Sequence, residues 1–349
     1  MKYAPIKIAT LNRSTHFIKL IESLKLNDWA IYTDIYIGLD FPPSKKYEEG
    51  WKKICDYLDQ GDFSVFSSFN IIKRDINYGA SKNAYDLAKR IFNKYDRCIV
   101  LQDDMEVSHN FIEYMDKCLD AFENDPSVIG VTAYSYPIKW ECSKDATCMK
   151  QNFNASMWGT GFWRDKYFYM VKSFSEGILF EDYKSFIKKK QYKNMIDACL
   201  SEYIPAATSL YPQRFSLLYM MSDVSLRAYL AKADKFFISP IFSKTRNNGF
   251  DGSGLYCQDI AKDGKGTTSY TYDYSIQPID NQKSFELKLN DESFLDINRI
   301  KLNNFDYRSP QQMKDSLRKL WLSRHLGLWA ARLYYVFSTP YKFLLKIRH

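Results

Sequence analysis

Short apolar runs alternate with amphipathic stretches along the first 130 residues of the chain. Continuous apolar runs of this length are typical of buried strands, and apolar residues at helical spacing indicate helices that pack on one side. The four predicted strands lie at 6–11, at 30–40, within 63–75 and at 98–101. Because strand and helix alternate four times, the pattern predicts an α/β fold with a doubly wound, mostly parallel sheet.

The helices between these strands are predicted from the same pattern. The first begins near Ser14 or Thr15, either of which can cap it. The second covers 47–59, and the third lies within 77–95. The buried face of the first helix is predicted to consist of Phe17, Leu20, Ile21 and Leu24.

After about residue 130 the alternation becomes irregular. A strand is predicted at 128–136, and a long irregular stretch follows it. Later segments are a helical region at about 170–200, a helix at 222–233, a polar glycine loop at 245–254 and a basic helical tail from about 309. The predicted parts are 1–130 and 131–285, the two halves of one domain, and a C-terminal helical extension at 286–349.

Composition narrows the class of protein. The formal net charge is +8, with basic residues concentrated at 188–195 and in the last 36 residues. Basic patches favour nucleic acid, anionic lipid or anionic ligands, but no nucleic-acid-binding motif is present, so we expect no nucleic-acid partner. The start of the chain lacks the apolar core of a signal peptide, and no apolar run is long enough to span a membrane.

Cysteine usage indicates the redox compartment. The seven cysteines are an odd number and form no CxxC pair, which favours reduced thiols in a cytosolic protein. Pairing of Cys142 with Cys148 under oxidising conditions stays open.

Two adjacent carboxylates follow the apolar run at 98–101. Asp103 and Asp104 stand where an open α/β sheet binds its ligands, just before a helix that Asn110 can cap with Glu113 in capping-box spacing. Two such close carboxylates repel each other unless a positive charge lies beside them, and Mg²⁺ or Mn²⁺ prefers oxygen ligands. The alternative is a solvated turn acid followed by an acid that favours the helix dipole.

Three segments in order resemble a known family. They are LQDDMEVSHNF at 101–111, ASMWGTGFWRDKY at 155–167 and TRNNGFDGSG at 245–254. This set resembles bacterial GT-A fold glycosyltransferases related to the large inverting family. The first helix and the acidic strand end also resemble the Golgi enzyme that adds GlcNAc to N-glycan mannose. The resemblance covers about 4–257 and leaves out the tail.

The resemblance implies a function and a metal. It implies transfer of a sugar, with inversion, from a nucleotide sugar such as a UDP-sugar to a hydroxyl of a glycan acceptor in bacterial surface polysaccharide synthesis. Asp104 would ligate Mn²⁺ or Mg²⁺, and Asp103 would support the ribose or the metal's water. Gln102 replaces a glutamate of the Golgi relative. A protein histidine ligand is in doubt, because none of the four histidines lies in the glycine loop, which is expected to close over the donor.

The same resemblance implies further donor-binding residues. Arg13 would contact the diphosphate, and Asp40 the base or ribose; their alternatives are a surface arginine and a turn acid. Gly159 and Gly161 would let the backbone approach a ligand, and Trp158 and Phe162 could stack on a sugar; the alternative is an aromatic core around a glycine bend. The other donor-binding candidates are Thr10, Asn12, Asn77, Gly79 and Lys82.

An inverting transfer needs a base to take the acceptor's proton. Asp223 is the candidate, because it opens the helix at 222–233 as an acid does in the family. Glu181 and Asp182 are the second choice, and a plain helix cap at Ser222 or Asp223 is the alternative.

The tail at 316–349 mixes aromatic and aliphatic residues with arginine and lysine. This composition suits a helix on the anionic inner face of a membrane, where the acceptor can be lipid-linked; a helix docked on the domain or on a partner subunit is the alternative. We therefore expect a cytoplasmic protein, peripheral on the membrane if the tail binds lipid. The competing functions are a nucleotidyltransferase, whose glycine-rich first loop is missing here, and a non-catalytic carbohydrate-binding scaffold.

Overall fold

The computed structural model describes the N-terminal half of the chain nearly without a break and parts of the C-terminal half. The described residues are 1–135, 140, 142–152, 156–177, 221–249, 251, 253, 279–290, 318–319, 321–322, 325–327, 329–334 and 336–337.

Strands and helices alternate as the pattern predicts. The strands are β1 (Ile6–Thr10), β2 (Asp34–Leu39), β3 (Ser68–Lys73), β4 (Arg97–Gln102), β5 (Met105–Val107), β6 (Val128–Thr132), β7 (Cys148–Gln151), β8 (Thr160–Trp163), β9 (Phe236–Pro240) and β10 (Thr245–Asn247). The helices are α1 (Ser14–Lys25), α2 (Glu48–Gln60), α3 (Ala80–Phe92), α4 (Phe111–Ala121), α5 (Arg164–Ser175) and α9 (Asp223–Ala233), with short 3₁₀ helices η1 (Asp28–Tyr32) and η2 (Lys45–Tyr47).

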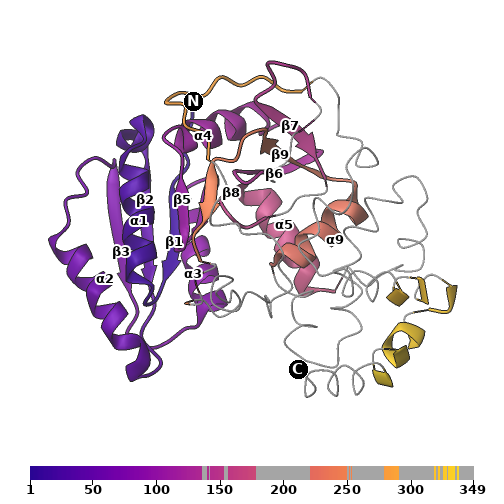
Figure 1. The fold of residues 1–349 in the computed structure, drawn as a ribbon, viewed down its shortest axis with the longest axis horizontal. Coiled ribbons are helices and arrows are strands. Elements are labelled where there is room, and N and C mark those ends of the chain that lie inside the picture. Colours follow the sequence, from indigo (N-terminus) through magenta and orange to yellow (C-terminus); the bar gives the residue numbers. More distant parts are fainter. Residues whose placement is uncertain are drawn as a thin grey trace.

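One mixed sheet runs through the described residues (Figure 1). Its order is β3-β2-β1-β4-β8-β6-β9-β7, and β3, β2, β1 and β4 are parallel neighbours. Strand β8 runs antiparallel to both β4 and β6, while β9 is parallel to β6 and β7 antiparallel to β9. The expected α/β architecture with a doubly wound, mostly parallel sheet is confirmed. The boundary expected at 130 divides a continuous sheet, and the three predicted parts stay a prediction.

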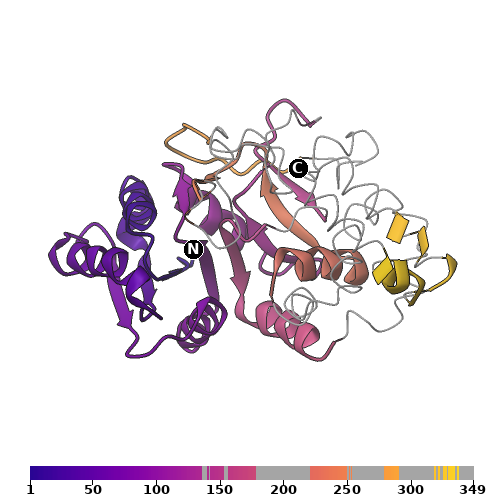
Figure 2. The same ribbon diagram turned by 60° about the horizontal axis from the view of Figure 1, so that its bottom comes forward.

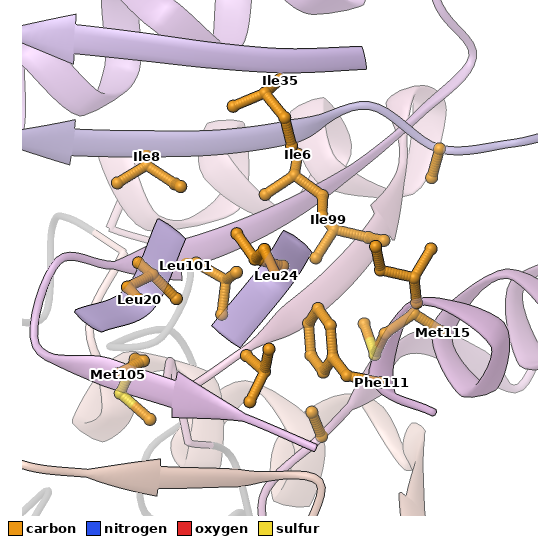
Figure 3. Packing of buried hydrophobic residues seen from close by; sticks show 14 of the residues in the cluster. Ile6, Ile8, Leu20, Leu24, Ile35, Ile99, Leu101, Met105, Phe111 and Met115 are labelled. Carbon is orange, nitrogen blue, oxygen red and sulfur yellow. The ribbon is translucent and has the colours of Figure 1, made fainter. Parts of the chain in front are cut away.

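Helices cover both faces of this sheet. Alternate residues of β1 separate the faces: Ile6 and Ile8 join the core under α1, α2 and α4, whereas Lys7 faces α3. Figure 3 shows residues of α1 and α4 packed on isoleucines and leucines of β1, β2 and β4. Figure 2 shows α3 on the opposite side of the first strands from α1 and α2. The expected buried face of α1 is confirmed in full.

Several local predictions were wrong. The segment expected to begin β2 forms η1 instead, so the strand starts only at Asp34. Neither Ser14 nor Thr15 caps α1, whose N-cap residue is Arg13 without a side-chain cap bond. Asn110 precedes α4, but its side chain bonds Asp280 and the Ser284 carbonyl instead of the helix.

The capping box at α4 fails for a second reason. Glu113 accepts bonds from the Phe285 amide and from Lys117, so the segment 279–290 takes both predicted capping partners. The pattern also missed β5, which is only three residues long, and β7, which lies in the stretch expected to be irregular. It predicted no strand at β8, β9 or β10 either. These elements owe their form to long-range pairing, which local periodicity does not encode.

The remaining expectations concern cysteines and the tail. No disulfide joins Cys142 and Cys148, and none is formed by the other cysteines in the described residues. Described positions between 318 and 337 are largely helical, as predicted for the tail. In the part of the chain that the structure describes, no helix combines the length and hydropathy of a membrane span.

A buried lysine in β1 departs from the apolar pattern. Lys7 is 4% exposed and donates a hydrogen bond of 2.9 Å from Nζ to the Ala84 carbonyl of α3. Burial lowers the pKa of this lysine from 10.5 to about 8. Below pH 8 the folded protein therefore carries a buried charge that the unfolded chain keeps in water, which lowers stability.

We predict that Lys7→Met raises the free energy of unfolding at pH 7 by roughly 1–3 kcal/mol, because it removes the buried charge and loses one hydrogen bond. Between pH 8 and 10 the folded protein binds fewer protons at Lys7 than the unfolded chain does, so wild-type stability rises with pH and the difference shrinks. Urea unfolding at pH 7 and pH 9.5 measures both, with the exposed Lys53→Met as control. A difference that does not change with pH would contradict this account.

Candidate active site

The acidic pair lies where three neighbouring strands end. Thr10 ends β1, Asp40 follows β2, and Asp103 and Asp104 follow β4. The Asp40 amide donates a bond of 2.9 Å to the Thr10 carbonyl, so these strand ends lie side by side. The sequence resemblance and the strand topology therefore both indicate that ligands bind at the carboxyl ends of these parallel strands.

Thr10, Arg13, Asp103 and Asp104, here called the acidic site, form one hydrogen-bonded group. The Thr10 hydroxyl donates to Asp103 Oδ2 at 2.8 Å. Arg13 Nη1 donates to Asp104 Oδ2 at 2.8 Å and lies 4.0 Å from Asp103 Oδ1. Arg13 stands before α1, in a loop whose Asn12 carbonyl packs so closely on Gly50 that a Cβ there would lie 1.9 Å away. The guanidinium supplies the positive charge that two adjacent carboxylates require.

The pKa of Asp103 is raised above its usual value. Burial, reinforced by the negative charge of Asp104, raises the pKa of Asp103 to about 6, although Arg13 and the Thr10 hydroxyl bond act to lower it. Asp103 is therefore mainly ionised at pH 7 and takes up a proton as the pH falls through about 6.

Asp104 has the features of a metal ligand. Its Oδ1 atom is buried and accepts no hydrogen bond from the described residues, and carboxylate oxygen is what Mn²⁺ and Mg²⁺ prefer. The described residues contain no group of three or more acidic, histidine or cysteine side chains that could hold a metal. The residues fit a cation that takes few protein ligands and completes its shell with phosphate and water oxygens.

A second segment covers the acidic site. Strand β10 pairs antiparallel with β5, and the Asn248 amide then donates to the Asp104 carbonyl at 2.9 Å. At Gly249 a Cβ would lie 2.2 Å from Asp104 Oδ2 and 2.7 Å from Arg13 Nη2. The start of the glycine loop thus lies on the acidic pair, and it can do so only because the residue there has no side chain.

Three residues of this region escaped the sequence analysis: His16, Asp251 and Ser253. His16 Nε2 lies 3.2 Å from Asp251 Oδ2 and 3.1 Å from the Asn248 carbonyl, and Arg13 Nε donates to Ser253 Oγ at 3.2 Å. The available signal was spacing, because His16 lies about one helical turn after Arg13. A histidine does reach the glycine loop, but it comes from α1.

A charged network braces the ribbon of β5 and β10. Glu106 Oε2 accepts bonds from Arg246 Nη2 at 2.6 Å and Asn248 Nδ2 at 3.2 Å, and Lys19 Nζ lies 2.8 Å away. Burial raises the pKa of Glu106, but bonds with Lys19 and Arg246 outweigh it and hold the pKa below its usual value. This network anchors the glycine loop at its first residues.

The other donor-binding candidates of the first half gather around Asp40. Its carboxylate accepts backbone bonds of 2.8 Å from both Tyr78 and Gly79, so it fixes the loop before α3. Asn77 donates to the Phe41 carbonyl at 2.6 Å, and Lys82 Nζ lies 4.3 Å from the centre of the Tyr78 ring. Gly79 has φ of +75° and open space where a Cβ would stand. Their contacts with a donor stay a prediction, as does that of the exposed Gln102.

The segment at 159–163 is buried in the interior. Gly159 has φ of +85° and fits against Ala133 and Thr245, and a Cβ on Gly161 would lie 2.9 Å from Leu119. The half-buried Trp158 meets the Tyr134 ring edge-on at 4.8 Å. Phe162 is fully buried, so the expectation that its ring stacks on a sugar was wrong. Close packing on α4 accounts for Gly161, and a donor role for this segment stays a prediction.

The candidate bases are less fully described. Asp223 is the first residue of α9, as predicted, and Ser222 caps the helix by accepting a bond from the Ser225 amide. The side chain of Asp223 lies outside the described residues, and so do Glu181 and Asp182.

No protein-family model matches the sequence, and no curated protein sequence matches it. Among solved structures, the mannosyltransferase PcManGT from Pyrobaculum calidifontis, in complex with GDP-Man and Mn²⁺, has a TM-score of 0.36 and 11% identity. The match covers 65% of this chain and 69% of that one. Mouse xyloside xylosyltransferase 1 has a TM-score of 0.34 and 8% identity over 68% of this chain and 84% of that one.

A crystal structure of S. aureus TarS has a TM-score of 0.34 and 11% identity, and the match covers 66% of this chain and 87% of that chain. In another TarS structure the chain spans only 25% of the matched chain. Likenesses at these TM-scores carry no argument about substrate or mechanism. By their names, the mannosyltransferase and the xylosyltransferase are both glycosyltransferases, the class that the sequence resemblance implies.

Proposed function

We propose that the chain is a GT-A fold glycosyltransferase that moves a sugar from a nucleotide sugar, such as a UDP-sugar, to a hydroxyl of a glycan acceptor with inversion. The observation that carries this proposal is the acidic site. Two carboxylates meet an arginine at the carboxyl end of parallel strands, and Asp104 Oδ1 has no hydrogen-bond partner among the described residues. A nucleotide diphosphate with a divalent cation matches this mixture of charges.

The residues of the acidic site would divide the work of donor binding. A divalent cation, Mn²⁺ or Mg²⁺, supplies positive charge that stabilises a departing diphosphate. Asp104 would hold it through Oδ1, and Asp103, fixed by the Thr10 hydroxyl, would orient ribose or a water. Arg13 keeps a buried Nη2 that makes no hydrogen bond among the described residues, which suits a phosphate oxygen.

The loop beside Asp40 would complete the donor site. Asp40 fixes the backbone at Tyr78 and Gly79, and Gly79 leaves open space at the start of α3. Lys82 lies on the first turn of this helix, where positive charge and backbone amides favour an anion. The glycine loop after Gly249 would exclude water from the donor.

The acceptor's proton needs a base on the other half of the sheet. Asp223 is proposed for this role because it opens α9, whose Tyr229 ring lies 5.8 Å from Phe174 of α5. The helix dipole favours a negative charge at a helix start. An ionised carboxylate there can accept the proton of an attacking hydroxyl.

The first alternative is a nucleotidyltransferase. Such an enzyme also binds a nucleotide and a metal, but the first strand–helix loop of this chain carries Asn12 and Arg13 in place of a glycine-rich turn. The second alternative is a non-catalytic scaffold that binds carbohydrate. Both differ from the proposal in one measurable respect, because only a glycosyltransferase hydrolyses or transfers a sugar from a nucleotide sugar.

Membrane contact through the tail extends the proposal to lipid-linked acceptors in bacterial surface polysaccharide synthesis. Several large apolar side chains between 318 and 337 are exposed, among them Trp321, Trp329 and Phe337 at 54, 62 and 76%. Arg332 on the same segment is also exposed. Aromatic and basic side chains together favour an anionic lipid surface, which would place the enzyme at the cytoplasmic face of the membrane.

We predict that Asp104→Asn reduces Mn²⁺-dependent sugar transfer or donor hydrolysis by at least roughly 100-fold, because the amide is a poor ligand for a hard cation. The fold should be retained, since the side chain lies at the end of a strand. Turnover of a panel of nucleotide sugars measures this. The control is Asp59→Asn, because Asp59 is an exposed carboxylate that pairs with Lys73. Near wild-type turnover of the Asp104→Asn variant would show that Asp104 holds no catalytic metal.

We predict that Asp223→Asn lowers the transfer rate by roughly 100-fold or more and leaves the affinity for the donor nearly unchanged, because a base acts on the acceptor. Steady-state kinetics and calorimetric titration of the donor separate the two effects. Ser222→Ala is the matched control: it removes the cap and should cost about 1 kcal/mol of stability with little loss of rate. Equal losses of rate in the two variants would indicate that Asp223 is only structural.

We predict that replacing Trp321, Trp329 and Phe337 together by serine weakens co-sedimentation with phosphatidylglycerol vesicles, because the variant loses apolar surface that enters the lipid interface. Wild-type binding should also fall as salt rises from low to high ionic strength. Donor hydrolysis in detergent-free solution serves as the control for folding. Unchanged sedimentation of the triple variant would exclude this face as the membrane contact.

A further inference from the structure

One side chain links the acidic pair to the segment that covers it. Arg13 bonds Asp104 through Nη1 at 2.8 Å and Ser253 through Nε at 3.2 Å, and its Nη2 lies 3.9 Å from Asp251 Oδ1. The three contacts involve residues more than 90 positions apart in sequence. The position of Arg13 is therefore set by the acidic pair and by Asp251 and Ser253 together.

Arg13 offsets one of the two negative charges of the acidic pair. Asp103 and Asp104 contribute two negative charges, and among the described residues the guanidinium of Arg13 is the cation that lies within 4.0 Å of both. The side chains of both Arg13 and Asp104 are largely buried, at 15 and 10% exposed, so water screens their attraction poorly. A divalent cation at Asp104 would meet the guanidinium at close range, and two positive charges at one carboxylate repel each other.

We propose that Arg13 is a tethered counter-ion that competes with the divalent cation for Asp104. The bond from Nη1 to Asp104 Oδ2 weakens when a cation binds Oδ1, because the guanidinium and the cation repel each other across one carboxylate, and the guanidinium is then available to a donor phosphate beside the cation. This inference rests on the proposed function, because it assumes that Asp104 binds the metal. It assigns Arg13 a second role, in which it lowers the affinity of the ligand-free protein for metal.

The geometry supports exchange of partners by a small movement. Arg13 already has Ser253 and Asp251 on its other side, so the guanidinium keeps two partners when it leaves Asp104. Asp104 in turn has Oδ1 unbonded within the described residues and available to a cation. Neither group therefore loses all of its partners in the exchange.

Mn²⁺ binding to the ligand-free protein, measured by electron paramagnetic resonance of free Mn²⁺, tests this inference without any reaction. Arg13→Gln should bind Mn²⁺ at least roughly tenfold more tightly than wild type, a factor that corresponds to about 1.4 kcal/mol. Lys19→Gln is the matched control: Lys19 is also a cation on the face of α1 near this region, but it pairs with Glu106. It should change the affinity much less.

Two further variants keep the test decisive. Arg13→Lys retains the charge and should bind Mn²⁺ nearly as weakly as wild type, which also covers the case in which the glutamine variant unfolds. Asp104→Asn should abolish the tight site in the Arg13→Gln background. Equal or weaker Mn²⁺ binding by Arg13→Gln would overturn the competition yet leave the proposed transferase intact, provided that wild type still binds Mn²⁺. Absence of Mn²⁺ binding in all variants would overturn both the competition and the metal-assisted part of the proposed function.

Discussion

Repulsion between two adjacent carboxylates is the constraint on which this end of the molecule depends. Asp103 and Asp104 stand together at the end of a central strand, largely withdrawn from water, and such a pair is stable only beside positive charge. Arg13 supplies that charge from the junction of β1 and α1, beside β4 in the sheet. The loop that carries it is pressed against Gly50, and Thr10 fixes the orientation of Asp103. The close packing of Asn12 on Gly50 thus helps to fix the loop that carries Arg13.

Strand pairing between β5 and β10 sets where the glycine loop begins. The ribbon of β5 and β10 leads the chain back over the acidic pair, and Gly249 lets the backbone approach Asp104. Glu106 holds the start of the loop, and Arg13 and His16 meet its later residues Asp251 and Ser253. The described residues of this loop thus lie against the acidic site.

Sequence reasoning succeeded where local periodicity and topology suffice. The parallel strands, the buried face of α1 and the placement of the acidic pair followed from apolar patterns, because a buried strand and an amphipathic helix each leave a regular trace. The caps of α1 and α4 failed, since Asn110 and Glu113 are taken by the distant segment 279–290. Tertiary contacts outcompeted the local capping bonds there.

The site shows the same division. The sequence placed Asp104 and Arg13 near the same end of the sheet. It missed His16 and Asp251, which are 235 positions apart in the sequence and lie in contact. It also left open whether the Phe162 ring stacks on a sugar or lies in the core, where β8 places it. A motif names residue types and spacing, whereas the direction of a side chain depends on which strands become neighbours.

The central claim is that the acidic site binds a nucleotide diphosphate together with a divalent cation. Calorimetric titration of UDP and of GDP into the wild-type protein, with and without Mn²⁺, tests it most directly. The account predicts that one of these nucleotides binds with an affinity that rises at least roughly tenfold when Mn²⁺ is present, because the cation bridges Asp104 and the phosphates. Binding of both nucleotides that is absent, or that is equally strong with and without Mn²⁺, would contradict it.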